Sequence, residues 1–398
     1  MERLNLCYPP QHDPAVIERH LRRLLVPGAL TDSSLERRAA VLDDRFRSYC
    51  AYYPYGLWTP GLVITREMRG LTDFYLPMVE IRRAFESLFA DALRFSPFLP
   101  ASLVHTSSDW LDSLQKLQPV VCRANPASLL RSLMADEELR RRFIFANFLP
   151  ARYGGGFGRY PGQTEFLRSW LGNNRGRLAG EVRCLDAACG SGEGTYDLAL
   201  LLMEGGLAAD SMHLRGVTLE PLELFAAAHG YFPHDPERQN TYRLRLGPLL
   251  AGGTTKHIRF SLEDLTMPVP TEGKGYDIIL CNGLLGGPFL HDWRFVSETV
   301  ARLAQRLRPG GILLAANRFH GGWKKLLSDN ALREMFAGCD LRMLPVVEGV
   351  AGVRQGLGTG DQGPGTRDQG LGTRDWGTGN REQGTGNREQ GTGIGNWQ

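Results

Sequence analysis

The sequence has few cysteines and very few lysines, and both shortages exclude classes of protein. The seven cysteines among 398 residues include no C-x-x-C pair and no Cys/His spacing typical of a metal site, so neither a disulfide framework nor structural zinc is expected. Only five of the 46 basic residues are lysines, and 43 acidic residues leave a formal net charge of +3. This near balance gives no global field that would attract nucleic acid or an anionic membrane.

Long apolar runs are absent as well. No run approaches the roughly 18 to 20 residues that a membrane span needs, and the first residues lack the cationic and apolar segments of a secretion signal. We therefore expect a cytoplasmic protein with reduced cysteines and no membrane insertion.

Glycine is unevenly distributed. Fifteen of the 48 glycines lie from Gly352 onward, and residues 361–395 form a seven-residue repeat (DQGPGTR, DQGLGTR, DWGTGNR, EQGTGNR, EQGTGIG). Such a segment cannot bury enough apolar surface to offset its ordering entropy. We expect residues 358–398 to be a disordered, low-complexity tail, and a translated DNA repeat explains it better than a tether or docking arm.

Two regions of different periodicity precede the tail. Apolar residues recur at helical spacing in residues 1–150, which predicts a mostly helical domain. Residues 151–357 change to short apolar runs that alternate with helical segments, a pattern typical of a Rossmann-like, doubly wound α/β sheet. The expected helices of the first region are 16–25, 35–49, 78–93 and 127–148, and the seven expected strands are 182–188, 213–219, 257–260, 276–281, 311–316, 341–347 and 350–355.

One strand-to-helix junction carries most of the chemical information. Residues 185–194 read LDAACGSGEG, an apolar strand that runs into small residues and then into a helix at 195–203. Small residues there let a ligand approach the backbone N–H groups of the helix N-terminus. The spacing is neither the dinucleotide G-x-G-x-x-G nor a phosphate loop, because no lysine follows and Asp186 precedes the turn. An acidic residue at this place suits a ligand with an ammonium group.

The junction resembles the first motif, D-x-G-x-G-x-G, of the class I S-adenosylmethionine-dependent methyltransferases. Asp186, Ala188, Gly190 and Gly192 occupy the four positions, with alanine in place of the first glycine. Later motifs follow in the family's order: the acidic turn at Asp264 and Leu265, the strand 276–282 that ends at Asn282, and the L-x-P-G-G turn at 307–311. This resemblance implies a seven-stranded class I methyltransferase sheet and S-adenosyl-L-methionine as the cofactor.

Within that superfamily the chain most resembles the CheR-type methyltransferases, which esterify glutamate side chains of chemotaxis receptors. Their first motif, A-x-C-x-x-G-E-x-x-Y, is matched at 187–196, where Cys189 and Glu193 stand. Their A-x-x-G-x-Y-P stretch is similar to residues 226–233. These enzymes hold the cofactor carboxylate with an aromatic–Arg pair ahead of the sheet, a role that the resemblance gives to Arg159.

Two segments depart from the CheR pattern. The second strand of the family usually ends with an Asp that holds the ribose hydroxyls, whereas Thr218 stands here. Lipid cyclopropane synthases use a Thr with a later Gln, so Thr218 with Glu223 is the first expectation for the ribose, and Glu220 is the second. The C-R-N-x-L-x-Y-F segment is replaced by CNGLLGGP at 281–288, without the Arg and the aromatic residue that border the methyl-transfer site.

Some residues keep a second interpretation. Glu193 could equally offset the dipole of the helix that it begins. Asp264 fills the family's acidic position better than Glu263, although either could cap a turn. Loop residues where a substrate could bind, but which are more often solvated or part of a turn, are His234, Asp235, His291 and His320.

Three functions remain open. The first is a CheR-like protein carboxyl methyltransferase, whose anionic acceptor needs no general base. The second is a small-molecule O- or N-methyltransferase, favoured if N-terminal aromatic residues close over the site. The third is a methyltransferase-like protein that binds a cofactor or a partner without catalysis. No catalytic residue or metal site is assigned, and the predicted cofactor contacts are Asp186, Ala188, Cys189, Gly190, Gly192, Glu193, Thr218, Glu220, Glu223, Asp264, Leu265, Asn282 and Arg159.

Overall fold

The computed structural model describes residues 6–53, 61, 63–118, 120–121, 123–150, 156–268, 275–316 and 325–355. The chain divides into two units, Met1–Leu357 and Gly358–Gln398. The predicted low-complexity tail and His320 lie outside the described residues.

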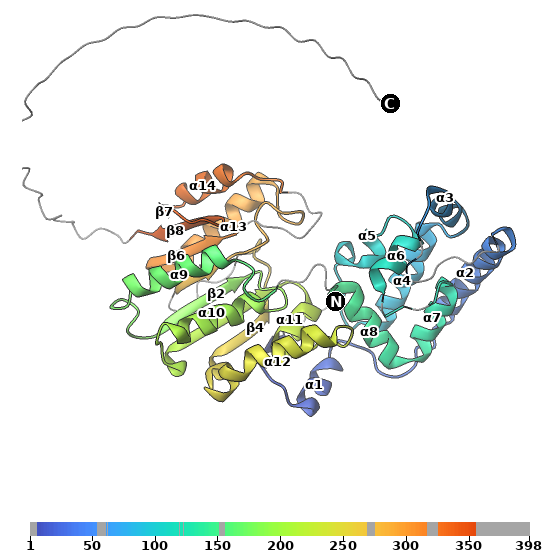
Figure 1. Ribbon diagram of the computed structural model, residues 1–398, viewed down its shortest axis with the longest axis horizontal. Helices are drawn as coiled ribbons and strands as arrows, with labels where there is room; N and C mark the ends of the chain where they lie inside the picture. Colours follow the sequence, from blue (N-terminus) through green and yellow to red (C-terminus); the bar gives the residue numbers. More distant parts are fainter. Residues whose placement is uncertain are drawn as a thin grey trace, which may run out of the picture. The chain divides into compact units, whose positions relative to one another are not determined.

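One sheet of eight strands organises the α/β part, in the order β1-β4-β3-β2-β5-β6-β8-β7 (Figure 1). The central strands β4, β3, β2, β5 and β6 run parallel; at one edge β8 pairs antiparallel with β6, and β7 pairs antiparallel with β8. The strands are β1 (Cys7–Tyr8), β2 (Val182–Ala187), β3 (Met212–Thr218), β4 (Ile258–Leu262), β5 (Tyr276–Leu280), β6 (Leu307–Ala315), β7 (Leu341–Leu344) and β8 (Val350–Arg354). The predicted doubly wound α/β fold is confirmed.

The predicted count of seven strands is wrong by one. The additional strand, β1, pairs antiparallel with β4, with Cys7 opposite Ser261 and Tyr8 opposite Phe260. A strand of two residues has no measurable alternation, so the sequence carries no periodic signal for it. Through this pairing Cys7 and Tyr8 join the edge of the sheet beside β4.

The central strands are buried on both faces, as parallel strands flanked by helices are. Cys184 and Ile278 belong to one apolar core, while their neighbours Leu185 and Ile279 belong to a second core on the opposite face. Helices α9 (Pro161–Asn173), α10 (Glu193–Glu204) and α11 (Pro221–His229) contribute buried side chains to the first core, and α13 (Trp293–Gln305) and α14 (Asp329–Ala337) to the second. This continuous apolar character explains why the strands could be recognised from short apolar runs.

Eight helices of the described residues lie in the chain between β1 and the start of the α/β part, and the others flank the strands from β2 onward (Figure 1). The helices before the sheet are α1 (Pro14–Leu21), α2 (Ser33–Tyr52), α3 (Arg66–Tyr75), α4 (Met78–Ala92), α5 (Leu103–Thr106), α6 (Trp110–Leu117), α7 (Pro126–Ala135) and α8 (Glu137–Phe148). Those of the α/β part are α9 (Pro161–Asn173), α10 (Glu193–Glu204), α11 (Pro221–His229), α12 (Pro236–Ala251), α13 (Trp293–Gln305) and α14 (Asp329–Ala337).

The segment 127–148 was predicted as one helix and forms two. Asp136 interrupts it with an extended backbone (φ −107°, ψ 108°), and its side chain accepts a hydrogen bond from Leu139 N at 3.0 Å. A short acidic residue that caps the following helix stabilises such a break. Apolar spacing continues across the break, which hides it from a periodicity argument.

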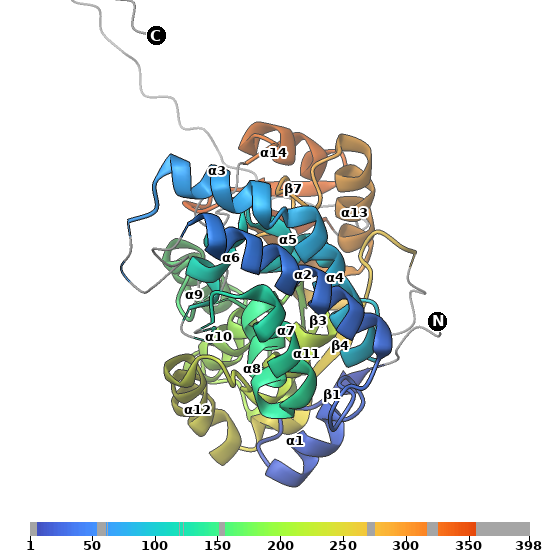
Figure 2. The ribbon, with the colours of Figure 1, turned by 90° about the vertical axis from the view of Figure 1, so that its right-hand side faces the viewer.

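Among the described residues, the N-terminal helices contact the α/β part through aromatic rings and hydrogen bonds. Phe145 of α8 packs edge-on against Phe225 of α11, with 6.0 Å between ring centroids. His234 Nε2 donates to the carbonyl oxygen of Leu149 at 2.8 Å. Figure 2 shows helices α2 to α8 on the side of the molecule that faces the viewer. We keep the division into a helical region, 1–150, and an α/β region, 151–357, as a proposal.

No helix in the described ranges is both long and apolar enough to span a membrane.

Candidate functional site

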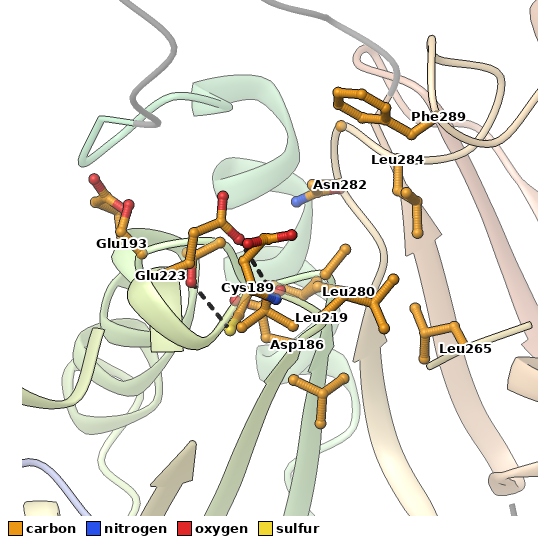
Figure 3. Close-up of a pocket in the computed structure, with 18 of the residues that line it drawn as sticks. Asp186, Cys189, Glu193, Leu219, Glu223, Leu265, Leu280, Asn282, Leu284 and Phe289 are labelled. Atoms are coloured by element: carbon orange, nitrogen blue, oxygen red, sulfur yellow. Dashed lines mark hydrogen bonds between the residues drawn. The ribbon is translucent and has the colours of Figure 1, made fainter. Parts of the chain in front are cut away.

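A cavity of about 670 Å³ lies at the carboxyl ends of β2, β3, β4 and β5 (Figure 3). Ligands of open α/β sheets bind at this edge. All residues predicted to contact a cofactor, apart from Gly192, line this cavity: Asp186, Ala188, Cys189, Gly190, Glu193, Thr218, Glu220, Glu223, Asp264, Leu265, Asn282 and Arg159. The structure thus brings together residues from segments that are more than 120 positions apart in the chain.

The turn between β2 and α10 is held by the neighbouring strand. The backbone N–H groups of Ala188 and Cys189 donate to the carbonyl oxygen of Val217 at 3.0 and 2.8 Å. Ala188 has a φ of +74°, which costs an L-residue roughly 1 to 2 kcal/mol. This is the position where alanine replaces the family's first glycine, so the left-handed turn is kept without the residue that adopts it most easily.

The two glycines of the turn serve different purposes. A Cβ at Gly190 (φ +53°) would meet no heavy atom within 4 Å, because the residue borders the cavity. A Cβ at Gly192 (φ +92°) would lie 2.8 Å from Ala227 Cβ and 3.1 Å from the Phe260 ring. Gly192 therefore lets the start of α10 pack against α11 and β4, and it does not face the cavity.

Alanine substitutions at these glycines should separate binding from stability. We expect Gly190→Ala to lower the free energy of unfolding by only about 1 to 2 kcal/mol and to weaken ligand binding strongly, because its methyl group enters the cavity. Gly192→Ala should cost roughly 2 to 5 kcal/mol through clash and strain combined. Denaturant unfolding and calorimetry with S-adenosylhomocysteine measure both effects. Equal stability losses in the two variants would contradict this division of roles.

Asp186 is a buried carboxyl at the end of β2 whose charge lacks compensation. It accepts a hydrogen bond from Thr195 Oγ1 at 2.7 Å. Burial is the main cause that raises its pKa to about 6, and the nearby charges of Glu193 and Asp197 act in the same direction. A cationic group in the cavity would favour the ionised form. The side chain is therefore suited to an ammonium ligand.

Glu193 begins α10 and forms a buried ion pair that the sequence did not reveal. Arg238 of α12 donates through Nη2 to Glu193 Oε1 at 2.6 Å and to Ser191 Oγ at 2.7 Å. Burial opposes ionisation of Glu193, but the charge of Arg238 and hydrogen bonds outweigh it, so the pKa of Glu193 lies below its usual value. Tyr242 adds a hydrogen bond from its hydroxyl to the Ser191 carbonyl oxygen at 2.7 Å. Helix α12 thus holds the glycine-rich turn in place.

Three polar residues that line the cavity lie at the end of β3 or just after it. Thr218 Oγ1 donates to Glu223 Oε2 at 2.7 Å and accepts from Glu220 N at 3.2 Å. Burial raises the pKa of Glu223, and burial together with the charge of Glu223 raises the pKa of Glu220 to about 8. The predicted Thr218–Glu223 pair is thus in hydrogen-bond contact, with Glu220 beside it.

The two carboxylates of the acidic turn after β4, Glu263 and Asp264, have different kinds of partner. Glu263 forms ion pairs with Arg306 and with Arg215, the latter at 3.0 Å. Asp264 makes no ion pair with another described residue and accepts from the backbone and hydroxyl of Thr266 at 2.9 and 2.6 Å. These contacts favour Asp264 over Glu263 as the residue that meets a ligand.

Asn282 is fixed by an amide pair that the sequence also did not indicate. Gln163 of α9 donates through Nε2 to Asn282 Oδ1 at 3.1 Å, and Asn282 Nδ2 donates back to Gln163 Oε1 at 2.7 Å. The backbone N–H of Ala316 donates to the same Asn282 oxygen at 2.8 Å. Both amides line the cavity, and their reciprocal bonds fix its polar wall after β5.

The N-terminal region supplies one wall of the cavity. Phe98 packs edge-on against Phe289, with 5.3 Å between ring centroids and an interplanar angle of 78°. Figure 3 shows Phe289 and Leu284 together on one side, away from Glu193 and Glu223. No motif marks this wall in the sequence, because only the fold brings it over the sheet. Its N-terminal members are Ser96, Pro97, Phe98, Ala101 and Phe148.

The described loop residues that were considered for substrate contact either form other hydrogen bonds or do not line the cavity. His234 bonds to Leu149, and Asp235 accepts from Arg238 N at 3.0 Å as the cap of α12. His291 is not among the residues that line the cavity. In the described ranges no group of three or more His, Cys, Asp or Glu residues could hold a metal ion.

Known proteins similar in sequence are chemotaxis protein methyltransferases. The chain is 28% identical over 174 residues to one from Listeria monocytogenes serovar 1/2a and 30% identical over 174 residues to one from Listeria innocua serovar 6a. Each match covers 42% of this chain, and the chain spans 61% of the length of each relative. No protein-family profile matches the chain.

Solved structures with similar folds include two methyltransferases. Magnesium protoporphyrin IX methyltransferase from Synechocystis PCC 6803 has 18% identity and a TM-score of 0.34, covering 55% of this chain and 98% of the other. The N-methyltransferase NodS from Bradyrhizobium japonicum has 14% identity and a TM-score of 0.35, covering 55% and 99%. The chain thus has a doubly wound α/β fold and is similar in sequence, over 42% of its length, to the chemotaxis protein methyltransferases.

Proposed function

We propose that the protein is an S-adenosylmethionine-dependent methyltransferase whose cofactor occupies the cavity at the carboxyl ends of β2 to β5. One observation carries this proposal: a single cavity collects the residues that the motifs assign to the cofactor, with the exception of Gly192. If the glycine-rich turn belonged to an unrelated fold and resembled the motif only by chance, Thr218, Asp264 and Asn282 would not be expected around the same cavity.

The residues of the cavity fit the chemical groups of this cofactor. Asp186 would accept from its ammonium group, and Arg159 would hold its carboxylate. The hydrogen-bonded Thr218 and Glu223 would receive the ribose hydroxyls, with Glu220 as the alternative. Open space at Gly190 leaves room for close approach to the backbone.

Two apolar side chains would flank the adenine. Leu219 is 62% exposed although it follows a buried strand, and Leu265 lines the same cavity after the adjacent strand β4. An exposed leucine at a cavity wall gains from an aromatic ligand that covers it. Asp264, next to Leu265, would accept a hydrogen bond from the exocyclic amine.

The bound cofactor supplies an electrophilic methyl group, and the protein orients the acceptor and excludes water. Phe98, Phe148, Leu284 and Phe289 contribute apolar side chains to the lining of the cavity. Displacement at a methyl group needs alignment of acceptor and leaving group, which a closed wall can impose. The amide pair Gln163–Asn282 would orient the acceptor or the cofactor at this wall.

Two acceptor classes are candidates. Similarity to the chemotaxis protein methyltransferases supports a protein glutamate carboxylate. The aromatic residues Phe98 and Phe289, which pack on each other at the cavity, support a small molecule with an oxygen or nitrogen acceptor, because they offer an apolar surface on which it can lie. We favour the small molecule on this observation.

Transfer of a radiolabelled methyl group to cell extract tests the proposed activity. Purified protein is incubated with methyl-labelled S-adenosylmethionine, and the extract is then separated into protein and small-molecule fractions. We expect label in the small-molecule fraction. Base-labile label on protein would instead support the carboxylate acceptor, and no transferred label despite cofactor binding would support a binding protein without catalysis.

The pH dependence of cofactor binding should report on Asp186. An ammonium group requires the ionised carboxylate, which is present above a pKa of about 6 and lost below it. S-adenosylhomocysteine affinity should therefore be constant above about pH 7 and fall up to about tenfold per pH unit below pH 6. Calorimetry between pH 5 and pH 8 measures it, and circular dichroism confirms that the fold persists. An affinity that stays constant down to pH 5 would exclude this role.

A further inference from the structure

The cavity has a strong excess of acidic groups, and this excess limits what it can accept. Seven carboxyl side chains line it, and Arg159 is the one basic residue among the described lining residues. No histidine or lysine belongs to that lining. The carboxyl residues are Asp186, Glu193, Asp197, Glu220, Glu223, Glu263 and Asp264.

Most of these carboxyl groups have partners in the protein or, if the proposed function holds, in the cofactor. Glu193 pairs with Arg238, and Glu263 pairs with Arg306 and Arg215. Asp197 accepts from the backbone N–H of Gly158 at 2.6 Å. The proposed cofactor placement provides donors for Asp186, Glu223 and Asp264. Glu220 is left without a cationic or hydroxyl partner in this assignment.

Glu220 lies at the N-terminal wall. Glu220 and Phe98 line the same cavity, the backbone of Phe98 is near enough to Glu220 to lower the pKa of its carboxyl group, and the Phe98 ring packs on Phe289. A carboxyl group that shares a cavity with two aromatic rings is a combination that recognises ammonium ions, because the ring faces attract cations as the carboxylate does. This wall belongs to the part of the cavity that the cofactor assignment leaves for the acceptor.

We propose that the acceptor is an amine on a small apolar or aromatic molecule, bound as its ammonium ion by Glu220 beside Phe98 and Phe289. This inference rests on the proposed function and names the substrate class of the same cavity. It assigns Glu220 to the acceptor and not to the ribose.

The proposed step balances in atoms and charge. An ammonium nitrogen has no free electron pair, so its proton first passes to the Glu220 carboxylate. The nitrogen lone pair then forms a bond to the methyl carbon, while the electron pair of the broken carbon–sulfur bond stays on sulfur. The positive charge moves from sulfur to the methylated nitrogen, and the proton on Glu220 leaves to water when the product departs.

The environment of Glu220 suits both binding and proton transfer. Its pKa of about 8 shows that burial and Glu223 disfavour a bare negative charge there, and a bound ammonium ion would supply the missing positive charge. A raised pKa also brings the carboxyl closer to that of an ammonium ion, which eases the transfer of the proton. A carboxylate acceptor would enter an already acidic site and is disfavoured.

Calorimetry on the complex with S-adenosylhomocysteine tests the inference with matched amines and acids. The probes are benzylamine and phenethylamine, compared with phenylacetate and 3-phenylpropanoate. We expect the wild-type complex to bind at least one of the amines at least tenfold more tightly than either acid. Glu220→Gln should lower the affinity for that amine at least tenfold and change the affinity for S-adenosylhomocysteine less than twofold. Glu237→Gln, an exposed carboxyl of α12 outside the cavity, is the control and should change neither.

The possible failures have different signatures. If the wild-type protein does not bind S-adenosylhomocysteine, the proposed function fails and this inference fails with it. If the cofactor product binds but neither amine binds, or the acids bind as well as the amines, the inference alone is wrong. Loss of S-adenosylhomocysteine binding in Glu220→Gln would place Glu220 at the ribose and would also overturn the inference.

Discussion

Replacing Arg238 with methionine is expected to lower the free energy of unfolding by about 3 to 5 kcal/mol, because it leaves the Glu193 carboxylate buried without its cation. Both side chains of the pair are nearly inaccessible to solvent, and their 2.6 Å contact is the shortest that Arg238 makes. The Arg238 guanidinium also lies 4.2 Å from the centroid of the Phe232 ring, so the variant loses a cation–π contact as well. Urea unfolding followed by circular dichroism measures the loss.

Two comparisons make this result specific to the buried charge. The double variant Glu193→Gln/Arg238→Met should recover a large part of the stability, since it removes the unpaired charge together with its partner. Arg294→Met breaks an ion pair with Glu298 that is largely exposed, and should cost less than about 1 kcal/mol. The loss in Arg238→Met should also shrink at lower pH, where the stranded carboxyl takes up a proton. Similar losses in the Arg238 and Arg294 variants would contradict the account.

Replacing Asp186 with asparagine is expected to weaken S-adenosylhomocysteine binding by roughly 10- to 150-fold, equivalent to about 1.5 to 3 kcal/mol for a hydrogen bond to a charged group. Asparagine keeps the shape of the side chain and can still accept from Thr195, so the packing at the end of β2 should survive. Calorimetry at pH 7.5 measures the affinity.

The matched control is Glu204→Gln at the exposed far end of α10, which should leave the affinity unchanged. Asp186→Asn should also remove the fall in affinity below pH 6, because the titrating group is gone. It should not destabilise the protein, since the wild-type carboxyl already carries the unfavourable desolvation that raises its pKa. An affinity within twofold of wild type would remove Asp186 from the site.

Much of the α/β fold is predictable because its strands are short, apolar and buried on both faces. Apolar periodicity does not reveal an element that is too short, and it does not separate two consecutive helices that share one periodicity. Strand β1 has two residues, and the break at Asp136 falls inside a continuous helical pattern. The break at Asp136 could have been predicted from the local sequence, because Asp136 followed by Glu137 and Glu138 is typical of a helix N-terminus.

The residues of the candidate site could also be predicted only in part from the sequence. The motifs indicated the cavity residues because they lie next to strand ends, where local sequence and position in the sheet coincide. Arg238, Gln163 and Phe98 come from helices or loops that only the tertiary fold brings to the site. Gly192 was predicted from the same motif as Gly190 but packs away from the cavity, since a glycine pattern does not distinguish ligand approach from helix packing.

The proposed activity requires that this cavity binds the methyl-donor cofactor. Titration of the purified full-length protein with S-adenosylhomocysteine in a calorimeter at pH 7.5 tests it most directly. We expect one molecule to bind per chain, with affinity reduced in both Asp186→Asn and Gly190→Ala and retained in Glu204→Gln. No binding by the wild-type protein, or binding that neither cavity variant weakens, would contradict the account.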